Sequence, residues 1–165
     1  LSLLGVDITK RFVYVDTHCT EEVLSIAEST ILKAKAMDKP YAVIKGIDHR
    51  IETHHVTLRD LSRSPSVEIA SEKAGVHDAP VDVAEIYAPF SHQEIIVKRA
   101  LGLDNSVAIN PSGGVLAGHL FMASGLSRVG EVAKRIIAGE YKRGVAHATS
   151  GPCLQQNMIT VLEGM

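Results

Sequence analysis

The stretch VDVAEIYAPFSHQEIIVKRAL, residues 81–101, decides the fold class of this chain of 165 residues. Its first six residues form a short and mainly apolar run, which is typical of a buried strand. Ser91 and Glu94 then have the spacing of a capping box, and the helix that this box begins is expected to end at Gly102. A buried strand followed directly by a helix indicates an α/β domain.

The alternation of strand and helix continues on both sides of this stretch. Residues 22–28 fit a strand and a helix equally well, and the strand at 41–47 can extend to about 55. The hydrophobic periods, caps and breakers predict strands at 12–15, 41–47, 81–86, 144–149 and 158–162, and helices at 29–37, 64–74, 91–101 and 115–138. The last two strands are expected to form an antiparallel hairpin. The fold class is therefore α/β, with a mixed five-stranded sheet flanked by helices.

The longest of the predicted helices is expected to be buried along much of its length. Small residues occupy its first half and would allow close packing in a central layer: Ala117, Gly118, Ala123, Ser124 and Gly125.

Composition and charge argue against several classes of protein. The chain has 17 Lys and Arg and 19 Asp and Glu, a net charge of −2, so nucleic-acid binding through phosphate contacts is not expected. No apolar run approaches the ~20 residues of a membrane span, and no signal-peptide pattern occurs, so we expect a cytoplasmic protein that does not bind membranes. The two cysteines, Cys19 and Cys153, are too few for a disulfide framework. A histidine cluster at 49–55 lacks recognisable metal-ligand spacing, so no metal is expected there.

The first residues suggest a piece of a longer protein. The chain begins with Leu1 rather than Met, and it begins inside an apolar run. We therefore expect that a preceding segment is missing and that residues 1–165 form one domain.

Three loops carry the residues best suited to chemistry: 85–94, 110–114 with the following Gly118-His119, and 147–153. Backbone N–H groups at glycines can bind an oxyanion, and a histidine with a cysteine can supply acid–base and nucleophilic chemistry. Each feature also has a structural explanation. The glycines can serve backbone conformation, His119 can be a hydrogen-bonded core residue, and Cys153 can be an inert small apolar side chain.

The order of these loops resembles the C-terminal half of the thiolase superfamily, and more closely its lipid-transfer or acetyl-CoA acetyltransferase branch. The resemblance runs from about Asp16 to Gly164. The blocks that carry it are Asp82–Ile86 with Phe90, Asn110–Gly114, Gly118-His119, Ala123–Arg128 with Glu131, and Ala146–Asn157. Their order over about 80 residues is more specific than any one block.

The resemblance implies a thiolase-like layered half and three catalytic positions. His119 matches the histidine that activates the nucleophile and polarises the thioester oxygen. Tyr87 stands where the family has an Asn that holds a catalytic water. Gly151 stands at the position of the family's proton-shuttling cysteine, and Cys153 follows two residues later. Implied substrate-binding residues are Asn110, Gly113, Gly114, Ser150 and Gly151, with no cofactor other than a coenzyme A thioester as substrate.

The implied function is that of the C-terminal domain of a thiolase-like acyltransferase that forms or cleaves a C–C bond in acyl-CoA thioesters. The family's acylated cysteine lies in the N-terminal half, so this chain alone is expected to be inactive. The alternative is a non-catalytic acyl-CoA-binding, lipid-binding or scaffold protein, which the residues at 87 and 151 favour. Expected partners are acyl-CoA, further copies of the chain and a small zinc-ribbon protein. Self-association is expected through apolar surface near Leu1 and residues 158–162.

Overall fold

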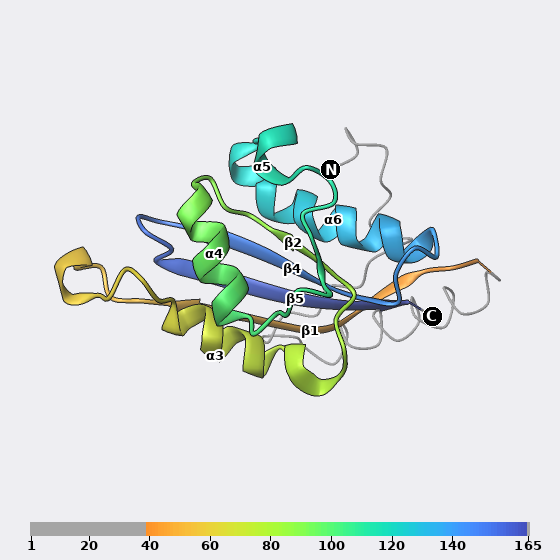
Figure 1. Cartoon of the computed structure of the whole chain (residues 1–165), viewed down its shortest axis with the longest axis horizontal. Helices are drawn as coiled ribbons and strands as arrows, with labels where there is room; N and C mark the ends of the chain where they lie inside the picture. Colours follow the sequence, from red (N-terminus) through yellow and green to blue (C-terminus); the bar gives the residue numbers. More distant parts are fainter. Residues whose placement is uncertain (1–38, 165) are drawn as a thin grey trace, which may run out of the picture.

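The computed structural model describes residues 39–164, which form one mixed five-stranded sheet with the strand order β1-β5-β4-β2-β3 (Figure 1). The strands are β1 (Ala42–Ile51), β2 (Val83–Ile86), β3 (Ala108–Ile109), β4 (Arg143–Ser150) and β5 (Gln156–Gly164). The α-helices are α3 (Pro65–Lys73), α4 (Ser91–Ala100), α5 (Gly114–Ala117) and α6 (Ser124–Ile137). Short 3-10 helices are η2 (Val56–Leu58), η3 (Val76–Asp78) and η4 (Phe121–Ala123).

The strand directions bring three loops to one edge of the sheet. Strand β2 pairs in parallel with both β3 and β4, whereas β5 runs antiparallel to β4 and to β1. The carboxyl ends of parallel strands meet at the same edge. The chain therefore leaves β2, β3 and β4 at a shared edge, which we call the carboxyl edge.

Helices cover both faces of the sheet. Helices α3 and α4 pack on one face, and α6 packs on the other (Figure 1). Alternation along β2 assigns the side chains: Ala84 and Ile86 belong to the α3–α4 core, and Val83 belongs to the α6 core. Odd-numbered residues of β2 consequently face α6.

The predicted α/β class and the mixed five-stranded sheet are confirmed. The antiparallel hairpin of β4 and β5 and the helices that begin near 64 and 91 are also present. The fifth strand of the described sheet is β3, which was not predicted because it has only two residues. The expected strand at 12–15, the ambiguous segment 22–28 and the expected helix at 29–37 lie outside the described residues.

The predicted single helix at 115–138 is wrong. The segment divides into α5, η4 and α6. Gly118 has an extended backbone (φ −166°, ψ 113°), and Phe121 has a left-handed φ of 48°. Neither conformation continues an α-helix, so the hydrogen-bond ladder stops at Ala117 and restarts only at Ser124. Glycine's low helix propensity lowers the cost of the break.

The expected burial is wrong for the first half of this segment. Helix α6 buries Val129, Val132 and Ile136 against the sheet, but the residues before it are open to solvent. An exposed apolar patch results, made of Leu116, Leu120, Phe121, Met122 and Leu126, which we call the 116–126 patch. The apolar surface expected at 158–162 is absent from the described part of the chain, because Ile159, Val161 and Leu162 are fully buried. Within residues 39–164, no helix is long and apolar enough to cross a membrane.

Candidate functional site

The structure brings Tyr87 and His119 together at the carboxyl edge. Tyr87 follows β2 and, as an odd-numbered residue, points to the α6 face, where the segment between α5 and η4 carries His119. Its hydroxyl lies 3.3 Å from His119 Nδ1, and the two rings are parallel, with an interplanar angle of 6°. Tyr87 is buried and His119 is exposed, so His119 is not the core histidine of the structural explanation.

In this pair Tyr87 is held in place by the sheet, whereas His119 is open to solvent. The backbone N–H of Tyr87 donates to the carbonyl of His147 on β4, which anchors the residue beyond the end of β2. The imidazole of His119 also contacts the ring of Phe121, with 4.5 Å between the ring centroids. Since Nδ1 faces Tyr87, Nε2 remains the ring nitrogen for a ligand.

Asn110 holds the second predicted loop to its neighbours. Its side-chain oxygen accepts a hydrogen bond from the backbone N–H of Ile86 at 2.6 Å, and its amide nitrogen donates to Glu94 at 2.7 Å. Glu94, predicted as part of a capping box, thus makes a tertiary contact instead. Both ends of the Asn110 side chain are occupied within the protein, which favours a structural role in this conformation.

A buried ion pair fixes the same loop from the α6 face. Glu85 on β2 is fully buried and pairs with Arg128 on α6, with 3.1 Å between Oε2 and Nη1. The hydroxyl and the backbone N–H of Ser112 both donate to the Glu85 carboxylate, at 2.7 and 2.9 Å. Arg128 also donates to the Ser112 hydroxyl. We call Glu85, Ser112 and Arg128 the α6-side network.

The backbone N–H groups of Gly113 and Gly114 already donate hydrogen bonds within the protein, so in this conformation they are not free to bind a substrate. The N–H of Gly113 donates to the carbonyl of Asn110, and the N–H of Gly114 donates to the Ser112 hydroxyl. Gly113 has a left-handed φ of 89°, which explains the glycine there by backbone conformation. The substrate-binding role of Asn110, Gly113 and Gly114 stays a prediction, and α5 is too short to form an anion site at its N-terminus.

The third predicted loop lies at the tip of the β4–β5 hairpin. Ser150, Gly151 and Cys153 are all exposed, and the thiol of Cys153 is free. Gly151 has a φ of 74°, which is strained for a cysteine, and a Cβ there would lie 2.6 Å from the side-chain oxygen of Gln155, which would have to move. No hydrogen bond among the described residues joins Cys153 to Tyr87 or His119.

A second network, which the sequence did not reveal, reaches the Cys153 loop from the other face of the sheet. Glu52 follows β1 and forms an ion pair with Arg59, with 3.1 Å between Oε2 and Nε. Its Oε1 accepts hydrogen bonds from the Ser66 hydroxyl and N–H at the start of α3. Burial alone would raise the pKa of Glu52, but the hydrogen bonds from Ser66 and the Arg59 charge lower it overall.

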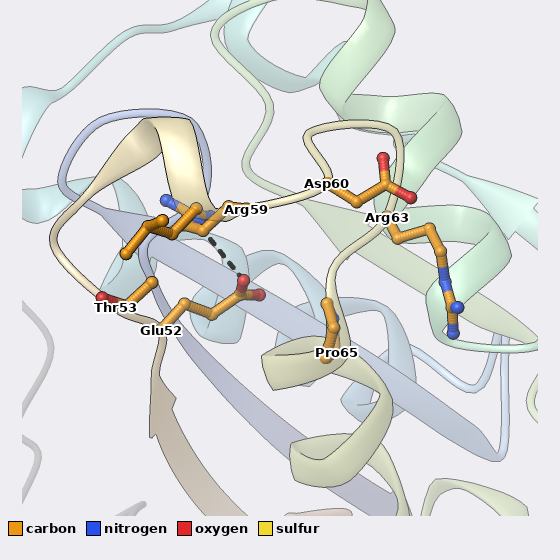
Figure 2. Close-up of a pocket in the computed structure, with 7 residues that line it drawn as sticks. Glu52, Thr53, Arg59, Asp60, Arg63 and Pro65 are labelled. Atoms are coloured by element: carbon orange, nitrogen blue, oxygen red, sulfur yellow. Dashed lines mark hydrogen bonds and ion pairs between the residues drawn. The ribbon is translucent and has the colours of Figure 1, made fainter.

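A shallow cavity of about 350 Å³ lies beside this pair (Figure 2). Figure 2 shows Arg59 turned toward Glu52, with Arg63 pointing away from both. The lining residues are Glu52, Thr53, Leu58, Arg59, Asp60, Arg63 and Pro65. Two carboxylates oppose two guanidinium groups, so the lining has no excess of one charge.

A buried histidine extends this network toward the centre of the sheet. His147 Nε2 lies 3.0 Å from Asn157 Oδ1, and the Asn157 amide donates to the Ser66 hydroxyl. Burial lowers the pKa of His147 to about 4, so the imidazole is neutral at pH 7. We call Glu52, Arg59, Ser66, Asn157 and His147 the α3-side network. Its members are separated by up to about a hundred residues, which is why no local motif announces it.

Within residues 39–164, no group of three or more His, Cys, Asp or Glu side chains is arranged to hold a metal. His54, from the histidine cluster, instead lies 2.6 Å from the side-chain amide of Gln155.

Left-handed backbone conformations outside glycine mark the same edge. They occur at Asn110, Phe121, Cys153 and Leu154, in the loops of the candidate site. Such conformations cost energy and persist where the surrounding structure holds them, often at functional sites.

Comparison with protein families gives a match over most of the described residues. The family model described as "Thiolase, C-terminal domain" matches residues 39–161. No curated protein matches the sequence significantly.

Two solved structures illustrate the likeness of fold. A monomeric SCP2-thiolase-like protein type 1 from Mycobacterium smegmatis has a TM-score of 0.60 and 15% identity over 74% of this chain and 29% of that one. The human mitochondrial 3-ketoacyl-CoA thiolase has a TM-score of 0.57 and 25% identity over 74% of this chain and 30% of that one. The chain therefore spans about 30% of the length of these structures.

Proposed function

Because this chain belongs to the thiolase family by its C-terminal domain, we propose that it forms the acid–base side of a site that acts on acyl-CoA thioesters. The observation that carries the proposal is the contact between Tyr87 and His119 at the carboxyl edge. The reaction class is transfer of an acyl group with formation or cleavage of a C–C bond. The acylated cysteine of the family belongs to the N-terminal half, so we place the nucleophile outside residues 39–161.

The Tyr87–His119 contact supports two roles for the imidazole. When the Tyr87 hydroxyl donates to Nδ1, the proton of His119 is on Nε2, which can then donate to the thioester oxygen. When Nδ1–H donates to the phenol oxygen, Nε2 is a base that can take the proton of a thiol. Because a phenol can donate or accept, the contact with Tyr87 is compatible with both tautomers of His119 and with both roles.

Cys153 is the proposed second acid–base group. Its position two residues after Gly151, on an exposed loop at the same edge, supports this role. In the reaction a base at this position removes a proton from the α-carbon, and the resulting carbanion attacks the acyl thioester. The thiolate of the nucleophile then leaves as the new C–C bond forms.

Binding of acetyl-CoA to the purified chain, followed by isothermal titration calorimetry, tests the proposal. We expect His119→Ala to weaken binding by about tenfold, the value of one hydrogen bond to a polarised oxygen. Tyr87→Phe should weaken it in the same direction, because it removes the hydrogen-bond partner that orients the imidazole. His92→Ala and Tyr141→Phe are matched controls away from the pair and should bind as the original chain does. Equal binding by all four variants, or no binding by any form, would contradict the proposal.

Turnover provides a second measurement. The chain by itself is expected to show no acetoacetyl-CoA thiolysis, because the proposed nucleophile is not among its matched residues. Thiolysis that disappears in Cys153→Ser would instead make Cys153 the nucleophile.

A non-catalytic acyl-CoA-binding or lipid-binding role is the second candidate. Tyr87 and Gly151 stand where the family has Asn and Cys, and within residues 39–164 no hydrogen bond joins Cys153 to the Tyr87–His119 pair. This role predicts acetyl-CoA binding that Cys153→Ser leaves unchanged and no turnover in any assembly.

The 116–126 patch supports a proposal about partners. An apolar cluster of this kind usually meets another surface, so we propose that it is covered by a second copy of the chain or by another thiolase-like half. We also propose, from the resemblance to the family, a small zinc-ribbon protein as a further partner and a cytoplasmic location.

A further inference from the structure

Arg59 makes contacts that a surface arginine does not make. Its guanidinium donates to the carbonyl oxygens of three consecutive residues at the tip of the β4–β5 hairpin. The distances are 3.2 Å to Pro152, 2.6 Å to Cys153 and 3.3 Å to Leu154. Its side chain is only 4% exposed although it lies in a connecting segment. The planar array of five N–H donors lets one arginine bind several acceptors at once.

The loop that Arg59 binds is strained. Cys153 and Leu154 are consecutive non-glycine residues in the left-handed region, with φ of 54° and 58°. Each such residue is unfavourable for an L-amino acid, and two in succession persist only when other contacts impose them. Their carbonyls point to one side, and the Arg59 guanidinium occupies that side.

Arg59 is itself held in place. Its Nε donates to Glu52 Oε2 (Figure 2). Glu52 Oε1 in turn accepts hydrogen bonds from the hydroxyl and the N–H of Ser66 at the start of α3. The guanidinium therefore connects a helix terminus to the hairpin tip and has no need of an external anion.

We infer that Arg59 is a positioning residue that fixes the backbone of residues 152–154 and so fixes the direction in which the exposed side chain of Cys153 leaves the carboxyl edge. The use of that orientation in acid–base chemistry rests on the proposed function. The mechanical part of the inference does not, since it concerns only the hairpin tip.

A spin label on Cys153 tests the inference directly. The chain has two cysteines, so Cys19→Ser leaves Cys153 as the single thiol for a nitroxide. In this background Arg59→Met should shorten the rotational correlation time of the label by about threefold, as an ordered loop becomes a mobile one. Arg59→Lys should give an intermediate value, because an ammonium cannot span three carbonyls. Arg63→Met is the matched control, since Arg63 lines the same cavity but pairs with Glu68.

Further variants separate positioning from a general loss of structure. Arg128→Met removes a buried ion pair elsewhere and should lower the melting temperature while leaving the spectrum of the label unchanged in the folded protein. If Arg59→Met does not fold, as judged by circular dichroism, Arg59→Lys and Glu52→Gln decide the question. A label as immobile in folded Arg59 variants as in the original chain would overturn the inference. The acetyl-CoA titration is independent of the label, so failure of the proposed function would be seen separately.

Discussion

The two polar networks each hold a loop of the carboxyl edge, one from either face of the sheet, but their contacts differ. On the α6 side, Glu85 and Arg128 are both buried, at 0% and 3% exposure, and Ser112 binds both of them. On the α3 side, Glu52 is 11% exposed, and Arg59 donates most of its hydrogen bonds to backbone carbonyls. The first network therefore holds the 110–114 loop to the buried faces of β2 and α6, whereas the Arg59 end of the second holds the strained loop at 152–154.

The comparison indicates which ion pair mainly raises the free energy of unfolding and which mainly fixes the conformation of a loop. Breaking a fully buried ion pair lowers the free energy of unfolding strongly, because the remaining charge is left without a counter-charge and without access to water. An arginine that binds carbonyls at the rim leaves groups that water can reach when it is removed. Its loss should alter the loop more than the fold.

The largest effect should come from opening the α6-side network. Arg128→Met leaves Glu85 buried without its counter-charge and should lower the free energy of unfolding by about 3–5 kcal/mol. Urea denaturation measures the change. Arg135→Met removes a more exposed pair between α6 and Glu140, which follows the helix; it is the control and should cost less than about 1 kcal/mol. A loss of similar size in both variants would mean that the two pairs do not differ as proposed.

The second effect is the loss of folding stability in acid that His147, a buried member of the α3-side network, should cause. Burial lowers the pKa of His147 from 6.5 to about 4, so the unfolded chain binds the proton over this interval and the folded chain does not. Stability should therefore be complete above pH 6.5 and fall as the pH decreases toward 4, by on the order of 3 kcal/mol. Glu52, whose folded pKa is lowered from 4.5, should add a further loss as the pH falls below that value.

Unfolding experiments at a series of pH values test this dependence. His147→Gln keeps a side-chain N–H for Asn157 but cannot titrate, so the slope between pH 6.5 and 4 should flatten. His92→Ala, at an exposed site, should leave the slope unchanged. An unaltered slope in His147→Gln would assign the acid sensitivity to other groups.

The third effect is smaller in energy. Arg59→Met should lower the free energy of unfolding by about 1–3 kcal/mol, less than Arg128→Met, because the freed carbonyls lie near solvent. Chemical denaturation of the two variants side by side measures the difference. If Arg59→Met proved the more destabilising of the two, the comparison between core support and loop support would be reversed.

The smallest effect on stability is expected in the 116–126 patch. Leu116→Gln combined with Met122→Gln replaces two fully exposed apolar side chains and should change stability by less than about 0.5 kcal/mol. Self-association at micromolar concentration, measured by sedimentation, should decrease. Leu58→Gln, at an exposed apolar residue outside the patch, is the control. A chain that sediments as a monomer before any substitution would remove the patch as a self-association surface.

The sequence by itself determined the elements that local signals encode. The apolar run at 81–86 predicted β2, the Ser64-Pro65 pair predicted the start of α3, and the alternating runs near the C-terminus predicted the β4–β5 hairpin. Capping, breaking and hydrophobic period act between residues a few positions apart, so they can be read along the chain. The order of the loop motifs also pointed to the thiolase family, which the family model confirms.

Only the tertiary structure decided how those elements are used. Gly118 and a left-handed Phe121 break the helix expected at 115–138, although the apolar period of the sequence continues through the segment. Glu94 binds Asn110 rather than closing a capping box. Arg59 reaches Cys153 across 94 positions of sequence, and Glu85 reaches Arg128 across 43. Contacts of this length arise when strands pair and helices dock, and a side chain's partner is then set by the geometry of the sheet, which no short motif contains.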